Sequence, residues 1–122
     1  MITLSRLVKS WLPSLAALCM LIALFVGGAQ NGAGSLFSPP WDKLAHVVFF
    51  FSLTLFMVSG FRLSVVTTTA AAILIGVLDE LHQIWLPRRF PGLDDWMADV
   101  VGVALAIGLI YYRKFHQKLD EF

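Results

Sequence analysis

The stretch between residues 79 and 99, DELHQIWLPRRFPGLDDWMAD, separates two long apolar segments of the chain. It contains five of the eight acidic residues and two of the nine basic residues. Pro87 ends the helical pattern before it, because proline has no backbone N–H to donate to a helix. Asp94 and Asp95 then precede the next apolar run. A carboxylate is favourable there, because the N-terminus of a helix carries a partial positive charge. The stretch therefore predicts the end of one membrane span, a polar loop and the start of another span.

The composition indicates an integral membrane protein. Of the 122 residues, 58% are hydrophobic and only 14% are charged, and the mean hydropathy is +0.79. A soluble domain of this size could not bury so much apolar surface, because small domains bury a limited fraction of their area. The net charge of +1 gives no reason to expect nucleic acid as a partner, and the lone Cys19 excludes an internal disulfide. We expect the lipid bilayer to be the main partner of the chain.

Long apolar runs between the charged residues predict a single all-α domain over residues 1–122. About 20 apolar residues are enough for one helix to cross a bilayer. The four predicted spans cover about residues 11–29, 44–61, 63–86 and 95–112. The first of them has an alternative interpretation as a cleaved signal peptide, because Arg6 and Lys9 precede the apolar run and small residues follow it.

The lysines and arginines predict the orientation of these spans, since they are enriched in cytoplasmic loops. With the N-terminus inside, six of them face the cytoplasm and three face the outside. Three tryptophans, Trp41, Trp85 and Trp96, then fall near the outer membrane interface, where tryptophan is common. We therefore expect a four-helix transmembrane bundle with both termini in the cytoplasm (N-in/C-in).

This topology gathers polar residues from distant parts of the sequence in one layer at the outer face. Ionisable groups inside a membrane are costly and are candidates for function. Three pairs of these residues are four positions apart and share a helix face: Asp42 with His46, Asp79 with Gln83, and Asp95 with Asp99. The candidate binding residues are Asp42, Lys43, Asp79, Gln83, Arg88, Asp95 and Asp99.

Some of these acids have a simpler explanation as helix caps. Asp42, Asp94 and Asp95 fall at helix N-termini, where carboxylates bind free N–H groups. Asp79 and Glu80 fall near a helix C-terminus, where the dipole disfavours negative charge, so they need a proton, a cation or a basic partner. The arginines of the following loop are close enough in sequence to supply that partner.

A divalent cation is an alternative partner for the same carboxylates, because Asp, Glu and His can ligate metals together. Networks of ion pairs give the same pattern in a sequence. The pattern by itself therefore does not distinguish a metal site from an ion-pair network.

Three short motifs in this layer resemble the VanZ-like family of bacterial membrane proteins. They are DKLAH at residues 42–46, DELHQ at residues 79–83, and the pattern that runs from Arg89 through Asp95 and Asp99 to Gly102. Their order over four apolar segments matches that family across about residues 37–110. The resemblance implies a multipass protein of the bacterial cytoplasmic (inner) membrane, linked through the family's namesake to teicoplanin resistance. The family usually has Asn in place of Asp99 and often Ser in place of Gly92, so this chain has a more acidic site.

Three functions are compatible with this polar layer. In the first, it binds or modifies an amphiphile, either a lipid headgroup or a lipoglycopeptide, in the cell envelope. The tryptophans would form an apolar rim, and Lys43, Arg88 and Arg89 would hold a phosphate or carboxylate.

The second function is enzymatic and would act on lipid-linked phosphate or ester groups. His46 or Glu80 would be the general base and Arg89 would stabilise developing charge. The third is structural, with the polar cluster only locking the four helices together.

Overall fold

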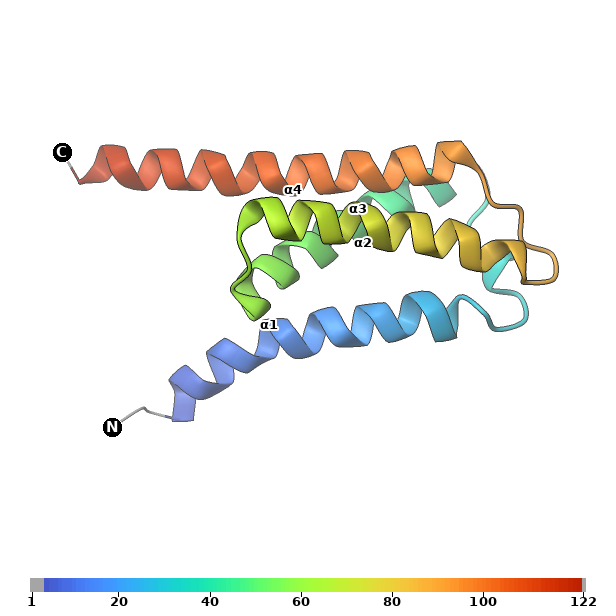
Figure 1. Ribbon diagram of the computed structural model, residues 1–122, viewed down its shortest axis with the longest axis horizontal. Coiled ribbons are helices and arrows are strands. Elements are labelled where there is room, and N and C mark those ends of the chain that lie inside the picture. The colour runs from blue at the N-terminus through green and yellow to red at the C-terminus, as the bar shows by residue number, and fades with distance from the viewer. Residues whose placement is uncertain (1–3, 122) are drawn as a thin grey trace.

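The computed structural model describes residues 4–121, and these form helices, turns and loops with no strand. The helices are α1 (Leu4–Ile22), α2 (Trp41–Phe61), α3 (Val65–Ile84) and α4 (Leu93–Asp120). Figure 1 shows that successive helices run in opposite directions, so that α1 begins and α4 ends at the same end of the bundle. The loops that follow α1 and α3 both lie at the other end. The expected all-α fold is confirmed.

Several helix boundaries have a local cause. Before α3, the Ser64 side chain accepts a hydrogen bond from the Thr67 N–H at 3.1 Å, which satisfies a free donor of the first turn. Arg62 ends α2 in the left-handed conformation, with φ of 53°. Gly92 is extended and directly precedes α4. Because no proline or glycine signal interrupts the basic tail after residue 112, α4 continues to Asp120, eight residues (112 to 120) beyond the predicted span.

Two of the helices, α2 and α3, are long and apolar enough to cross a membrane. Their outward surfaces carry large apolar side chains, among them Val48, Val66 and Leu74. The apolar helical stretch Trp11–Gly27 is shorter, and it combines most of α1 with the π-helical turn Ala23–Gly27 that follows it. A surface of this kind suits lipid, so the helices support a membrane protein.

The core lies between α2 and its neighbours, because α2 contacts each of the other three long helices. Its fully buried side chains include Ala17 from α1, Phe50 and Leu53 from α2, and Ala72 from α3. Ala17 shows that α1 is part of the packed bundle. Residues 111–120 of α4 are exposed and extend beyond this core.

Small residues let α4 approach α2 closely. Ala98, Gly102 and Ala106 are four positions apart, share one face of α4 and are all buried. A Cβ atom at Gly102 would overlap the Val47 carbonyl oxygen of α2. Close backbone approach through small residues is a common way to pack helices in membranes. It fixes the register in which the polar first turns of these two parallel helices meet.

Candidate functional site

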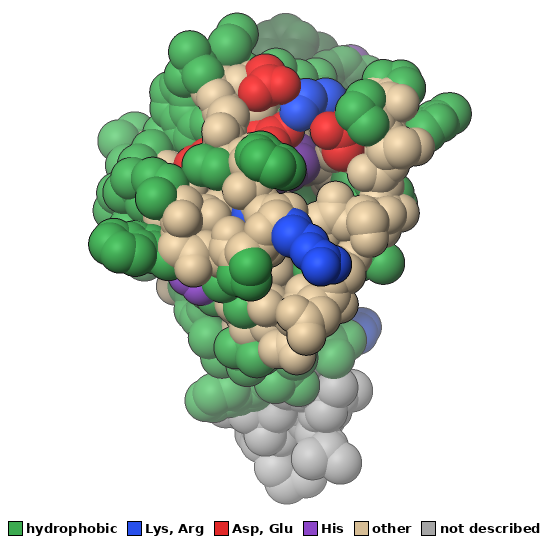
Figure 2. Space-filling view, turned by 90° about the vertical axis from the view of Figure 1, so that its right-hand side faces the viewer, with side chains coloured by type: hydrophobic (Ala, Val, Ile, Leu, Met, Phe, Trp, Pro, Cys, Tyr) green, Lys and Arg blue, Asp and Glu red, His purple; other side chains and the backbone are tan. Residues whose placement is uncertain are grey.

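The polar side chains predicted to share one layer do gather at the loop end of the bundle. Figure 2 views this end directly and shows acidic, basic and histidine side chains close together, with hydrophobic side chains around them. They come from the first turns of α2 and α4, the last turns of α3 and the loop between α3 and α4. The up-and-down topology places these four segments at one end, as their order in the sequence predicted.

Lys43 is the centre of one group of charges. Its Nζ lies 3.1 Å from Asp42 Oδ2 and 2.9 Å from Asp94 Oδ2, and it also contacts Asp95 Oδ1. The hydrogen bond from Lys43 holds the pKa of the exposed Asp94 carboxyl below its ordinary value. Lys43 therefore ties α2 to α4, and its charge is already balanced by three carboxylates.

One turn deeper, His46 and Asp99 form a second link between the same helices. His46 Nδ1 lies 2.7 Å from Asp99 Oδ1, and Asp99 is only 1% exposed. His46 follows Lys43 by three residues and Asp99 follows Asp95 by four, so both partners advance by about one helical turn. The other carboxylate oxygen, Asp99 Oδ2, is buried and has no hydrogen-bond partner among the described residues.

The two acids of α3 have neutral partners. Gln83 Nε2 donates to Asp79 Oδ2 at 3.0 Å, and the Gly92 N–H donates to Glu80 Oε2 at 2.8 Å. The expected ion pairs with the loop arginines are not formed within residues 4–121, where the ion pairs involve Lys43 and His46.

The two loop arginines lie in the loop between α3 and α4 without an ion pair among residues 4–121. Arg88 takes a left-handed backbone conformation with φ of 61°. The Arg89 side chain lies against the turn of the other loop, since a Cβ atom at Gly34 would be 3.0 Å from Arg89 Cδ. The Arg89 side chain therefore packs against the loop between α1 and α2, and both arginines line the cavity between the loops.

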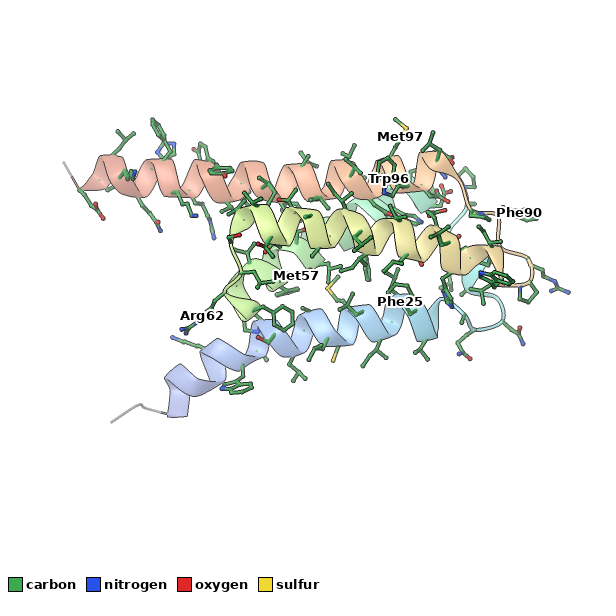
Figure 3. The ribbon with its side chains drawn as sticks, viewed as in Figure 1. Phe25, Met57, Arg62, Phe90, Trp96 and Met97 are labelled. Atoms are coloured by element: carbon green, nitrogen blue, oxygen red, sulfur yellow. The ribbon has the colours of Figure 1, made fainter. Side chains whose placement is uncertain are left out.

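Residues of these elements and of the two loops line a cavity of about 850 Å³ at the loop end of the bundle. Its apolar wall includes Leu24, Phe37, Phe49 and Phe50, and Phe90 stands at its edge in the loop (Figure 3). The polar residues that line it are Asp42, Lys43, His46, Asp79, Gln83, Arg88, Arg89, Asp94 and Asp95. Of the predicted site residues, Glu80 and Asp99 lie outside this lining.

The sequence did not identify which apolar residues line the cavity, although part of the set follows from helical spacing. Phe49 and Phe50 follow His46 by three and four residues, so helical spacing places them below it on the same face. Phe37 and Phe90 lie in loops, where no periodicity indicates direction.

A second, smaller groove of about 420 Å³ lies between the end of α3 and the start of α4. Glu80 and Trp96 line it together with apolar residues. Trp41 and Trp85 are exposed, whereas Trp96 is half-buried and points from α4 towards α3 (Figure 3). Only two of the three tryptophans of the expected rim are therefore at the surface.

Within the described residues, His46, Glu80 and Asp99 form the one group that could hold a metal ion. Each offers a ligand atom, and these atoms lie within 4.8 Å of one another. The sequence predicted a metal as an alternative for this layer but did not assign it to these three residues.

Comparison with known proteins agrees with the motifs. Residues 2–115 match the VanZ/LLP1 family. The match covers nearly the whole chain and includes every polar residue of the cavity and the group His46, Glu80 and Asp99. No curated protein and no solved structure matches the chain. The match confirms the resemblance read from the motifs and, with the two long apolar helices, indicates a membrane protein of the cell envelope. The chain belongs to the VanZ/LLP1 family.

Proposed function

We propose that this protein is a four-span protein of the bacterial cytoplasmic membrane whose cavity faces outwards and binds an amphiphile. The proposed domain covers residues 1–122, with spans at about 11–29, 44–61, 63–86 and 95–112 and both termini in the cytoplasm. The alternating helix directions and the excess of lysine and arginine at the end where α1 begins and α4 ends support this orientation.

The cavity is the observation that carries the proposal. Its volume of about 850 Å³ falls in the range of about 300–1,000 Å³ that is usual for small-molecule sites. Phenylalanine and leucine side chains line one part of it and charged side chains line another. A ligand with an apolar chain and a polar headgroup satisfies both parts.

The headgroup is proposed to be anionic and to be held by Arg88 and Arg89. Three carboxylates already surround Lys43, so a further anion there would meet repulsion. The two arginines line the cavity and form no ion pair within residues 4–121. A guanidinium group can bind a phosphate or a carboxylate through two parallel hydrogen bonds. Lipid phosphates and the acidic groups of a lipoglycopeptide such as teicoplanin share this chemistry, which would connect the protein to glycopeptide resistance or lipid homeostasis.

The test compares arginine variants in binding to defined lipids. The purified protein in detergent is titrated with fluorescently labelled phosphatidylglycerol, labelled phosphatidylcholine and teicoplanin. The double variant Arg88→Gln/Arg89→Gln should bind the anionic ligands at least about tenfold more weakly, since a charge-assisted hydrogen bond contributes about 1.5–3 kcal/mol. Arg62→Gln is a matched control, because Arg62 is also an exposed arginine with positive φ but lies at the opposite end of the bundle.

Equal binding of phosphatidylglycerol and phosphatidylcholine by the wild-type protein would contradict recognition of an anion. Unchanged affinity of the double variant for both anionic ligands would exclude the two arginines.

A second candidate function, an enzyme that acts on lipid-linked phosphate or ester groups, is favoured by the His46–Asp99 pair. The Asp99 carboxylate binds Nδ1 of His46, which lines the cavity. Nε2 of His46 then remains free to accept a proton, as in many general bases. Arg89 would stabilise developing charge, and Glu80 would be an alternative base. Lipid profiles of cells with and without the protein distinguish the two functions, because only an enzyme changes the headgroup or acyl pattern.

A further inference from the structure

Three side chains from three different helices meet beside the cavity, and one of them, His46, also lines it. His46 comes from α2, Glu80 from α3 and Asp99 from α4. One potential ligand atom of each lies within 4.8 Å of those of the other two. Residues up to 53 positions apart in sequence (46 to 99) are thus placed around one point.

Two carboxylate oxygens at this place have no hydrogen-bond partner among the described residues. They are Asp99 Oδ2 and Glu80 Oε1, and both atoms are shielded from solvent. An ionised carboxylate can only accept hydrogen bonds, and burying such an acceptor without a partner is costly. Asp99 is only 1% exposed, so bulk water does not satisfy it. The group needs a cation or a proton.

The fixed cations nearby do not fill this need. Lys43 is bound by three other carboxylates, and the loop arginines form no ion pair within residues 4–121. His46 contacts one oxygen of Asp99 and leaves the second oxygen free.

We propose that His46, Glu80 and Asp99 bind one divalent transition-metal ion of the zinc or manganese kind. Imidazole is a usual ligand of zinc and carboxylates are usual ligands of manganese, whereas magnesium and calcium prefer sites made of oxygen alone. Zinc lies about 2.0–2.2 Å from nitrogen and oxygen ligands, which places tetrahedral ligand atoms about 3.4 Å apart. The ligand atoms lie within 4.8 Å of one another, so a pair at that limit has to approach by about 1.4 Å (4.8 to 3.4) to reach that spacing.

The surroundings of the three residues suit such a site. The Gly92 N–H donates to Glu80 Oε2, which orients Glu80 and leaves Oε1 free to bind the ion. The missing side chain of Gly76 makes room for Asp99, because a Cβ atom there would lie 3.0 Å from Asp99 Oδ2. Three protein ligands leave a further coordination position open for water or a ligand. His46 also lines the cavity, so this position can be reached from it.

The experiment measures metal directly and does not depend on any amphiphile. The full-length protein is purified in detergent, stripped with a chelator, dialysed, and titrated calorimetrically with ZnCl₂, MnCl₂ or MgCl₂. Bound metal is then counted by elemental mass spectrometry. We expect about one zinc or manganese ion per chain, with magnesium binding at least about tenfold more weakly.

Three ligand variants and two controls test the assignment. Glu80→Gln, Asp99→Asn and His46→Ala should each lower the zinc affinity at least about tenfold, because each removes one ligand or its charge. The controls are Asp94→Asn, which changes an acid outside the trio, and His116→Ala, which removes an exposed histidine of the α4 tail. Both should bind zinc as the wild-type protein does.

Circular dichroism and size-exclusion chromatography identify any variant that does not fold, and the wild-type titration decides the proposal without those variants. A content of less than about 0.2 zinc or manganese ions per wild-type chain after loading overturns the metal site. Protons would then neutralise the buried carboxylates. Full zinc affinity in a folded Asp99→Asn variant overturns it equally, because the ion would then lie elsewhere.

Discussion

His46 of α2 and Asp99 of α4 meet with Nδ1 and Oδ1 2.7 Å apart, at a position where only 1% of Asp99 is exposed. The two residues are 53 positions apart (46 to 99) and belong to parallel helices that are not consecutive. A buried carboxylate of this kind is destabilising when it loses its partner. The relative position of α2 and α4 along their axes therefore depends on the charges of His46 and Asp99.

The His46–Asp99 pair should show strong energetic coupling. His46→Leu leaves Asp99 buried without its partner and should lower the free energy of unfolding by about 3–5 kcal/mol. The double variant His46→Leu/Asp99→Leu removes both polar groups and should recover most of that loss. Denaturant unfolding in detergent with a chelator present gives both values. Additive effects of the two substitutions would show that the residues are not coupled.

Gly102 should tolerate no side chain. Gly102→Ala places a Cβ against the Val47 carbonyl oxygen of α2, and we expect a loss of about 1–3 kcal/mol in stability. Gly108 is the matched control on the same helix, because a Cβ there meets no atom within 4 Å. Gly108→Ala should be neutral or more stable by about 0.5–1 kcal/mol, since alanine favours a helix. Equal melting temperatures of the two variants would show that α2 and α4 are not in close contact at Gly102.

The Lys43–Asp94 ion pair should contribute stability only above acidic pH. Lys43 lowers the pKa of Asp94 in the folded protein, so the unfolded chain binds a proton at higher pH than the folded one. The contribution is therefore present above the unfolded pKa of about 3.9 and is lost as the pH falls through the lower folded value.

Melting temperatures of the wild type and Asp94→Asn, measured from pH 7 to pH 3, check this dependence. The wild type should melt higher at neutral pH, and the difference should shrink below about pH 4. Asp120→Asn, at the end of α4, should follow the wild type throughout. A difference that grows on acidification would contradict the ion pair.

The proposed orientation predicts which positions react from outside the cell. In a Cys19→Ala background, which removes the only native cysteine, Phe90→Cys should react with a membrane-impermeant maleimide in intact cells. Phe90 is 87% exposed in the loop between α3 and α4. Lys118→Cys, at the exposed end of α4, should react only after the membrane is permeabilised. The opposite pattern would place the cavity on the cytoplasmic side.

Charge and hydropathy in the sequence determined the all-α fold and the polar residues that share one end of it. Apolar runs of about 20 residues separated by short polar loops leave few other arrangements, because each run must be buried in lipid or in protein. The order of the runs then brought DKLAH, DELHQ and the acids of α4 to the same end. The motifs alone also indicated the VanZ-like family, which the match to the VanZ/LLP1 family confirmed.

The partners of these residues were decided only by the tertiary structure. Spacing along the chain suggested that Arg88 and Arg89 pair with the acids of α3, but Gln83 and the Gly92 N–H take that place. Spacing alone also could not show that Lys43 would be surrounded by three carboxylates, nor that Asp99 would be buried beside His46 and Glu80. Those contacts depend on how deeply Gly102 lets α4 approach α2 and on how the loop turns at Arg88. A sequence records which side chains can meet, whereas the distance and rotation between packed helices determine which of them do.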